Sequence, residues 1–376
     1  MNELEKYNLK TNPFRLTPSS PDEIIWAGFH DLQKKIERRI SLAIKIPNSS
    51  LVLNWGDYGS GKTHAARFFC KESELLRIAK ENAVPFSLII DFPRSKETVK
   101  DIFVSIIDKL DIVELKERIK YDEDTFNKAL NQSTSNLFIR NIIKVMFSEE
   151  MTISLFPHDK EGTVNDFKGY LYGTADMRQF MSKGVQRKLS TENDYTEFLA
   201  ALFSFITFEK KYFSCVVLWF DEFESISTLG NASVGNVNNF FRTLIDKTPN
   251  NLLIFLNLTQ SPTMKVEDLS VYLHPSVRSR IKDRIELSIP NDEALKEYFK
   301  ELVNNPLFRI EETDNKFYPF DEIVVNNVIK DLGLSSSLRT YNDAFSLILD
   351  YAIEENEVIN DQYYQKIKSE VIGWKD

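Results

Sequence analysis

The sequence has 376 residues, 42% of them apolar, which is enough to build about two or three compact units with real cores. Its 47 basic and 56 acidic residues give a net charge of −9, which argues against a generally polycationic nucleic-acid binder and leaves only a local basic face open. Two cysteines and four histidines cannot build a disulfide framework or a zinc pattern. Because we see neither a signal-peptide pattern nor an apolar run of membrane-spanning length, we expect a reduced, cytoplasmic protein without a membrane partner.

Residues 1–28 are rich in Asn, Pro and Ser, and the segments Asn12-Pro13-Phe14 and Pro18-Ser19-Ser20-Pro21 disfavour regular helix. We therefore expect an extended arm. Over 31–44, apolar residues recur every four positions among Lys and Arg, which predicts an amphipathic helix. The next predicted elements are a strand at 50–55, a helix at 64–69 and a strand at 86–92.

The long interval that follows predicts helices at 97–110, 123–147 and 195–207, with a break at Pro157. A minimal core needs a much shorter connection here, so we interpret about 111–195 as a helical insertion. Apolar runs without alternation then predict strands of a parallel sheet that is covered on both faces. These strands are expected at 214–220, 252–258 and 284–287. After Pro290 only helices are predicted, at 292–303, 320–332, 336–351 and 361–372.

The segment Gly56-Asp57-Tyr58-Gly59-Ser60-Gly61-Lys62-Thr63 matches the phosphate-binding pattern G-x-x-x-x-G-K-[ST], called a P-loop, between a predicted strand and a predicted helix. The glycines allow a tight turn that points backbone N–H groups at a phosphate, and the helix N-terminus adds positive charge there. Lys62 is expected to reach the β- and γ-phosphates and the Thr63 hydroxyl to ligate Mg²⁺. We count His64, the next residue, with this loop. The sequence thus predicts binding of ATP and Mg²⁺.

A second signal is the apolar run Val216–Phe220, which ends in Asp221-Glu222. A carboxylate at the end of a strand beside the P-loop strand can hold Mg²⁺ through water, and we assign this role to Asp221. Glu222 is expected to polarise the attacking water as a general base. Glu224 is interpreted as surface charge. The alternative for the pair is an acidic turn that only meets solvent.

The P-loop and the acidic pair together resemble the Walker elements of the AAA+ ATPases, and with Asn12-Pro13-Phe14 they look most like the clade of origin-recognition initiators and transposition regulators. The resemblance covers about 28–110 and 195–355. It implies an α/β P-loop NTPase core of three layers with a parallel sheet, a helical insertion and an all-α lid. A short pattern, Tyr170-Leu171-Tyr172-Gly173 followed by the acidic pair, is also similar to ATP-binding components of phage-defence systems. The implied domains are an arm at 1–28, the core at 29–290 and the lid at 291–376.

Further residues follow from the resemblance alone. It implies a polar sensor 1 residue after the strand at 252–258, for which the candidates are Asn257, Thr259 and Gln260, with Thr259 or Gln260 preferred. It implies that Arg339, in the segment Gly333–Arg339, is the sensor 2 residue that contacts the γ-phosphate. The alternative is an ordinary exposed arginine on a helix.

The resemblance also implies an arginine finger in the segment 274–281, which would enter a neighbouring subunit's site. Arg280 is the first candidate and Arg278 the second. The alternative is a basic loop that binds a surface carboxylate or a nucleic-acid phosphate. We therefore expect a homo-oligomer with shared ATP sites.

The predicted function is an ATPase that hydrolyses ATP to ADP and phosphate to drive a conformational or assembly switch, in a mobile-element or phage-defence system. The insertion is expected to meet a protein partner. One alternative is a nucleotide-binding scaffold with little turnover.

Another alternative is an ATP-dependent DNA-binding regulator. Initiators of this clade usually carry a winged-helix domain after the lid, and few residues follow the predicted lid here, so DNA contact is expected only from the core or the insertion. The basic clusters Lys34-Lys35 with Arg38-Arg39, and Lys183 with Arg187-Lys188, are interpreted as solvated helix faces.

Overall fold

The computed structural model describes residues 3–15, 20–147, 167–261 and 264–373. The chain divides into two compact units. Unit 1 comprises Met1–Ile36, Trp55–Lys71 and Ile285–Asp376, and unit 2 comprises Glu37–Asn54 and Glu72–Arg284. This grouping differs from the division expected from the sequence, because the P-loop segment and the N-terminal arm cluster with the C-terminal helices.

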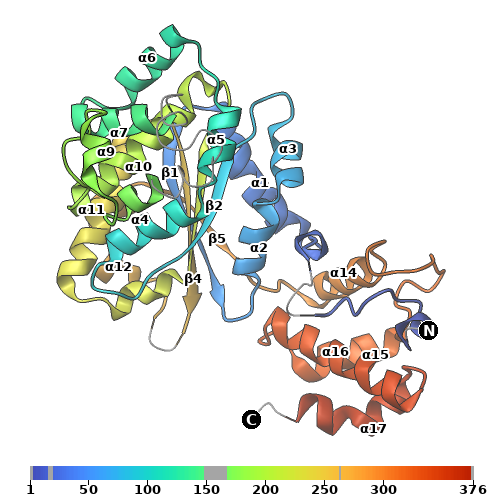
Figure 1. Ribbon diagram of the computed structural model, residues 1–376. Coiled ribbons are helices and arrows are strands. Elements are labelled where there is room, and N and C mark those ends of the chain that lie inside the picture. Colours follow the sequence, from blue (N-terminus) through green and yellow to red (C-terminus); the bar gives the residue numbers. More distant parts are fainter. Residues whose placement is uncertain (1–2, 16–19, 148–166, 262–263, 374–376) are drawn as a thin grey trace. The chain divides into compact units, whose positions relative to one another are not determined.

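Five strands form one parallel sheet in the order β2-β3-β4-β1-β5 (Figure 1). Strand β3 lies between β2 and β4, with Asp91 opposite Asp221 and Phe220 opposite Leu256. Every residue of β3 is buried, as the unbroken apolar run predicted for a strand covered on both faces. The strands are β1 (Asn48–Asp57), β2 (Phe86–Asp91), β3 (Val216–Asp221), β4 (Asn251–Gln260) and β5 (Ile281–Glu286).

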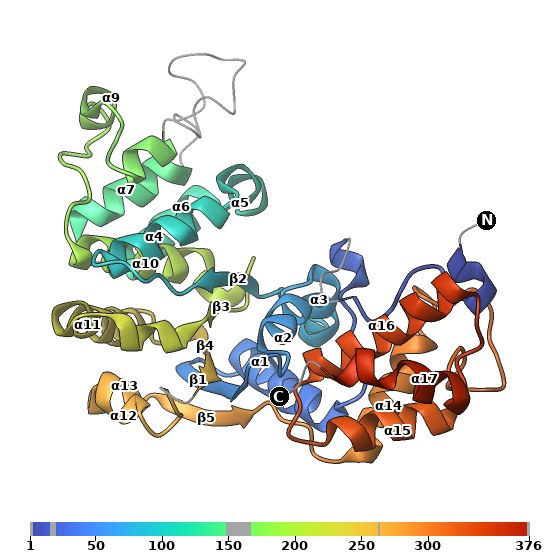
Figure 2. The same ribbon diagram turned by 90° about the horizontal axis from the view of Figure 1, so that it is seen from below.

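Helices of unit 2 gather on one side of β2 and β3, as Figure 2 shows for α4, α6, α7 and α10. Helix α10 is buried along most of its length and contacts α4, α6, α7 and α11. It begins with a capping box in which Thr191 and Asp194 satisfy each other's backbone N–H groups. The helices of this unit with their bounds are α3 (Glu72–Ala79), α4 (Thr98–Lys109), α5 (Ile112–Arg118), α6 (Glu123–Ser133), α7 (Leu137–Phe147), α9 (Met177–Met181), α10 (Glu192–Ile206), α11 (Asn231–Lys247), α12 (Leu269–Tyr272) and α13 (Pro275–Arg278).

The helix expected over 123–147 is in fact two helices, α6 and α7. Thr134 Oγ1 accepts a hydrogen bond from the Asn136 N–H, and Asn136 Oδ1 accepts one from the Phe138 N–H. These side chains replace helical backbone partners and so end one helix and start the next. The described part of the expected insertion contains the helices α5, α6, α7 and α9 joined by irregular segments, and the break predicted at Pro157 lies outside the described residues.

Unit 1 contains the lid helices at the positions that the sequence predicts. They are α14 (Asp292–Val303), α15 (Glu322–Leu332), α16 (Leu338–Glu355) and α17 (Asp361–Ile372). Helix α1 (His30–Lys45) begins in this unit, which also holds α2 (Lys62–Phe69).

The N-terminal arm supplies part of the lid core. Phe14 is 1% exposed, and its ring centroid lies 5.4 Å from that of Phe299 and 5.3 Å from that of Phe345. The Asn12 amide donates to Ser346 Oγ at 2.9 Å, and Tyr7 Oη donates to the Ala352 carbonyl at 2.5 Å. The arm is mostly irregular, as expected, but the lid bundle buries its aromatic side chains.

Within the described ranges, no helix is both long and apolar enough to cross a bilayer.

Candidate nucleotide site

The predicted P-loop joins β1 to α2, and its lysine points back into the loop. Lys62 is 6% exposed, and its Nζ donates to the carbonyls of Gly56 and Asp57 at 2.9 and 2.8 Å and to Ser60 Oγ at 3.1 Å. Gly61, the N-cap of α2, has a φ of 97°, a conformation that a side chain would strain. The loop therefore curves around a buried ammonium group at the start of a helix, as a phosphate-binding loop does.

Two other loop glycines are required by close neighbours. A Cβ at Gly56 would come within 2.4 Å of the Leu287 carbonyl oxygen. A Cβ at Gly59 would lie 2.7 Å from Ser337 Oγ and 2.8 Å from Arg339 Cβ. Glycine in this pattern thus serves packing in unit 1 as well as the turn.

Arg339 lies directly against the P-loop. Its backbone N–H donates to the Gly59 carbonyl at 3.2 Å, and its Nη1 donates to Tyr58 Oη at 2.5 Å. The guanidinium carbon lies 4.6 Å from the centre of the Tyr58 ring. The candidate for sensor 2 is therefore held beside the loop that would bind phosphates.

Helix α2 is also anchored to the N-terminal arm. His64 Nε2 lies 2.7 Å from the carbonyl oxygen of Ile25, so its ring bonds the arm backbone. The Trp26 ring packs on Phe68 and Phe69, with centroids 5.5 and 5.4 Å away. From the sequence we count His64 with the nucleotide-binding loop, and in the structure its ring bonds the N-terminal arm.

In unit 2, Asp221 ends β3 as a largely buried carboxylate, 6% exposed. Asn257 Nδ2 donates to Asp221 Oδ1 at 3.2 Å, and Asn54 Nδ2 donates to Asn257 Oδ1 at 3.1 Å. Both asparagines are fully buried. This row of side chains orients the carboxylate, and the sequence did not predict it because it joins strands far apart in the chain.

The three candidates for sensor 1 separate in the structure. Asn257 is occupied with Asp221, whereas Thr259 and Gln260 are half-buried at the carboxyl end of β4. The Thr259 N–H donates to Glu224 Oε2 at 2.9 Å. Glu224 is half-buried, and its carboxylate bonds the end of β4. This corrects its interpretation as surface charge.

Glu222 has an unexpected partner. Its backbone is left-handed, with a φ of 53°, and its side chain is 57% exposed. Arg94, three residues after β2, donates from Nη2 to Glu222 Oε2 at 3.0 Å and from Nε to Ser225 Oγ at 3.1 Å. In the sequence, the only sign of this contact is that a basic residue, Arg94, follows the strand at 86–92. The strand order, with β2 beside β3, is needed to show that Arg94 and Glu222 meet.

The two candidates for the arginine finger also differ. The Arg280 side chain is 25% exposed, and its guanidinium pairs with Asp246 of α11 and donates to the Ser276 carbonyl. Arg278 ends α13, is exposed, and forms no ion pair with any residue that the structure describes. The geometry thus favours Arg278, the second candidate, as the side chain able to reach another molecule.

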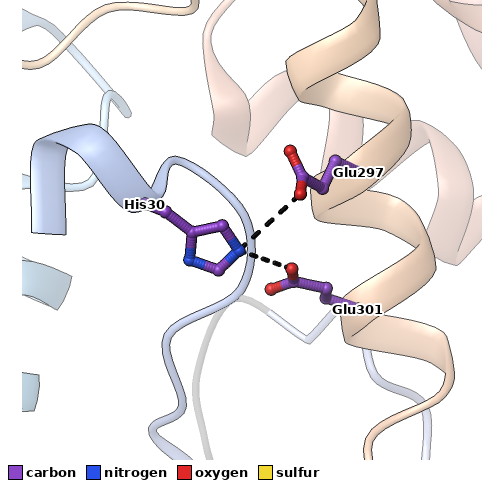
Figure 3. A group of neighbouring side chains, drawn as sticks. All are labelled: His30, Glu297 and Glu301. Carbon is purple, nitrogen blue, oxygen red and sulfur yellow. Dashed lines mark hydrogen bonds and ion pairs between the residues drawn. The ribbon is translucent and has the colours of Figure 1, made fainter.

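A separate cluster in unit 1 joins the start of α1 to α14 (Figure 3). His30 Nε2 lies 2.6 Å from Glu301 Oε1 and 3.7 Å from Glu297 Oε1. Glu301 Oε2 also accepts the Gly28 N–H at 2.7 Å. The hydrogen bond to Glu301 raises the pKa of His30, against the smaller lowering effect of burial. The three side chains could contact one cation, but they are partly exposed, and the ion pair alone accounts for their arrangement.

No protein-family profile and no curated protein sequence matches this chain. Solved structures do. The ORC1 protein of Aeropyrum pernix, in complex with DNA, is similar with a TM-score of 0.53 and 11% identity, over 96% of this chain and 70% of that chain. The ORC2 protein of the same organism, in complexes with ADPNP and ADP, is similar with a TM-score of 0.53 and 13% identity, over 96% of this chain and 72% of that chain.

The parallel sheet, the loop after β1 and the C-terminal helices define the fold class as an α/β P-loop NTPase. More narrowly, the likeness to ORC1 and ORC2 shows that this chain shares the fold of those two proteins, the AAA+ arrangement of a sheet core with C-terminal helices. Both levels of the fold expected from the sequence are confirmed.

Proposed function

We propose that this chain binds ATP with Mg²⁺ and hydrolyses it to ADP and phosphate, using the cycle to drive a conformational or assembly switch. The observation that carries the proposal is the buried Lys62 ammonium, which the P-loop carbonyls hold at the N-terminus of α2. A buried positive charge at a helix N-terminus is strongly favourable for a phosphate group. The fold of ORC2, whose structure contains ADPNP and ADP, gives further support.

Each chemical role falls to a residue with a suitable environment. Lys62 would bind the β- and γ-phosphates, with Thr63 at the first turn of α2 as a ligand for Mg²⁺. Asp221, oriented by Asn257, would hold the same ion through water. Bound Mg²⁺ would neutralise charge on the phosphates. That these residues serve one site is part of the proposal, and it follows from the resemblance of the two motifs to the Walker elements.

Glu222 is the proposed general base, which accepts a proton from water as the oxygen attacks the γ-phosphorus. Its side chain is exposed and its carboxylate is bonded to Arg94. A carboxylate that bonds Arg94 is not free to orient the attacking water, so release from Arg94 should accompany catalysis. Thr259 or Gln260 at the end of β4 is the proposed sensor 1.

We propose that a homo-oligomer completes the site and that Arg278, in preference to Arg280, enters from a neighbouring subunit. An arginine at the transferring phosphoryl group stabilises its charge in the transition state. Arg278 is exposed and without an ion pair among the described residues, while Arg280 is used within its own unit. Hydrolysis should then depend on assembly.

One observation favours a second candidate, a nucleotide-binding scaffold with little turnover. The ion pair of Arg94 with Glu222 would keep the base from water unless something breaks it. In that case a protein partner, which we place at the helical insertion, would be the activator. The proposed setting, a mobile-element or phage-defence system, rests on the sequence pattern.

DNA binding has weaker support, although the ORC1 structure contains DNA. Arg39 of the first basic cluster pairs with Asp283, and Arg187 of the second pairs with Asp194 through two bonds of 2.7 Å. Guanidinium groups that are already neutralised contribute little to a phosphate footprint.

The test is the ATPase rate per subunit against protein concentration, with molecular mass measured in parallel. We expect the rate and the mass to rise together, Lys62→Ala to lose nucleotide binding, and Glu222→Gln to bind ATP while hydrolysis falls by about 10²–10⁴-fold. Nucleotide binding without hydrolysis at any concentration would favour the scaffold. Absence of nucleotide binding would overturn the proposal.

A further inference from the structure

We propose that Tyr58 positions Arg339 at the nucleotide site, so that recognition of the γ-phosphate by the lid depends on an aromatic ring that the P-loop itself supplies. This inference rests on the proposed function and names a residue that acts through another.

Tyr58 is an unusual side chain for an exposed loop tip. It is 69% exposed, and among the described residues it contacts Arg339 through both its ring and its hydroxyl. The guanidinium carbon lies 4.6 Å above the ring centre, within the range of a cation–π contact. The hydroxyl also accepts a hydrogen bond from Nη1 at 2.5 Å. The ring and its hydroxyl therefore hold both the position and the orientation of the guanidinium.

The backbone brings the two side chains together. Ser337 caps α16 by accepting the Thr340 N–H, so the helix begins at Leu338. Arg339 N–H bonds the Gly59 carbonyl, which fixes the first turn of α16 on the loop. The clash that a Cβ at Gly59 would make with Ser337 and Arg339 shows how close this approach is. These backbone contacts fix the position of the Arg339 main chain, but they do not determine the direction of its long side chain.

Asp343 offers a competing direction. It lies one turn along α16 from Arg339, a spacing at which opposite charges attract. Burial raises the pKa of Asp343, and the charge of Arg339 opposes that rise, so the two groups already sense each other. Without the Tyr58 ring, Arg339 would turn along its own helix towards this carboxylate and away from the P-loop. Tyr58 therefore selects between two positions of one arginine.

The expected consequence is selectivity for the triphosphate. A guanidinium held at the loop can bond the γ-phosphate of ATP, which ADP lacks. An exposed cation–π contact corresponds to about a two- to fivefold effect on binding. Tyr58→Ala should thus weaken ATP binding about two- to fivefold and leave ADP binding nearly unchanged. Tyr58→Phe, which keeps the ring, should lie close to the wild type.

The experiment is a double-mutant cycle on the full chain. Dissociation constants for ATP and ADP, at fixed Mg²⁺, are measured for the wild type, Tyr58→Ala, Arg339→Ala and the double variant. We expect Tyr58→Ala to add nothing in the Arg339→Ala background. Asp343→Asn should restore part of the ATP preference of Tyr58→Ala, a rescue that a merely structural role of Tyr58 would not show. Arg178→Ala, at a side chain 92% exposed, is the matched control.

The outcomes separate the inference from the proposed function. If the wild type binds ATP and the two substitutions are additive, or if ATP and ADP weaken equally, the inference is overturned and the function stands. If the wild type binds neither nucleotide, both are overturned.

Discussion

The Arg94 guanidinium donates a hydrogen bond to the Glu222 carboxylate at 3.0 Å, which pairs the proposed base with a residue from the neighbouring strand's end. Both side chains are more than half exposed, so this ion pair is worth at most about 1 kcal/mol. A contact of that strength is suited to be broken during a cycle. In the proposed function, breaking this contact would let the Glu222 carboxylate turn to the attacking water, whereas in the scaffold alternative the contact would persist.

We expect Arg94→Ala to raise the basal ATPase rate about two- to fivefold, because the loss of the ion pair leaves the carboxylate of Glu222 free to orient the attacking water. Arg94→Lys should retain most of the pairing and serve as the control. Steady-state ATPase rates at one protein concentration provide the measurement. A lower rate in Arg94→Ala would instead make Arg94 a residue that supports hydrolysis.

The two arginine candidates should separate by phenotype. Arg278→Ala should lower the ATPase rate by about 10³-fold at unchanged stability, since its side chain is exposed and forms no ion pair with a described residue. Arg280→Ala should leave most of the rate and lower the free energy of unfolding by ~0–1 kcal/mol through loss of the Asp246 pair.

Mixing subunits tests whether Arg278 acts in trans. An equimolar mixture of Arg278→Ala and Glu222→Gln should regain activity, because some interfaces then combine an intact arginine with an intact base. A mixture as inactive as its components would place Arg278 outside the shared site.

Removal of the aromatic anchor of the arm should destabilise the lid. Phe14→Ala is expected to lower the free energy of unfolding by about 3–5 kcal/mol, because it opens a cavity among the rings of Phe299, Phe320 and Phe345. Urea denaturation provides the measurement, with Phe14→Leu as the milder variant. A loss below about 1 kcal/mol would mean that the arm contributes little to the lid core.

The cluster around His30 predicts a dependence of stability on pH. The hydrogen bond to Glu301 raises the pKa of His30 above the value of about 6.5 expected in the unfolded chain. The stabilisation is therefore fully present below about pH 6.5 and is lost as the pH rises through the folded-state pKa. We expect the stability difference between the wild type and His30→Gln to be larger at about pH 6 than at about pH 8.5, as measured by urea denaturation. An equal difference at both pH values would contradict the assignment.

Local patterns in the sequence predicted much of the fold. The P-loop motif, the apolar strands and the lid helices follow from glycine positions, unbroken apolar runs and helical periodicity, all of which are properties of neighbouring residues. The acidic pair at Asp221-Glu222 was visible for the same reason. Where local polar side chains compete with the helix, as at Thr134 and Asn136, the prediction of one continuous helix was wrong.

Partnerships between distant residues were decided only by the tertiary structure. Asn257 meets Asp221, and Arg94 meets Glu222, because β3 lies between β2 and β4. Likewise, Tyr58 meets Arg339 only after α16 packs on the P-loop. Periodicity determines which face of an element is buried, but it carries no information on which element covers that face, so the sequence could name the reactive groups and not the side chains that hold them.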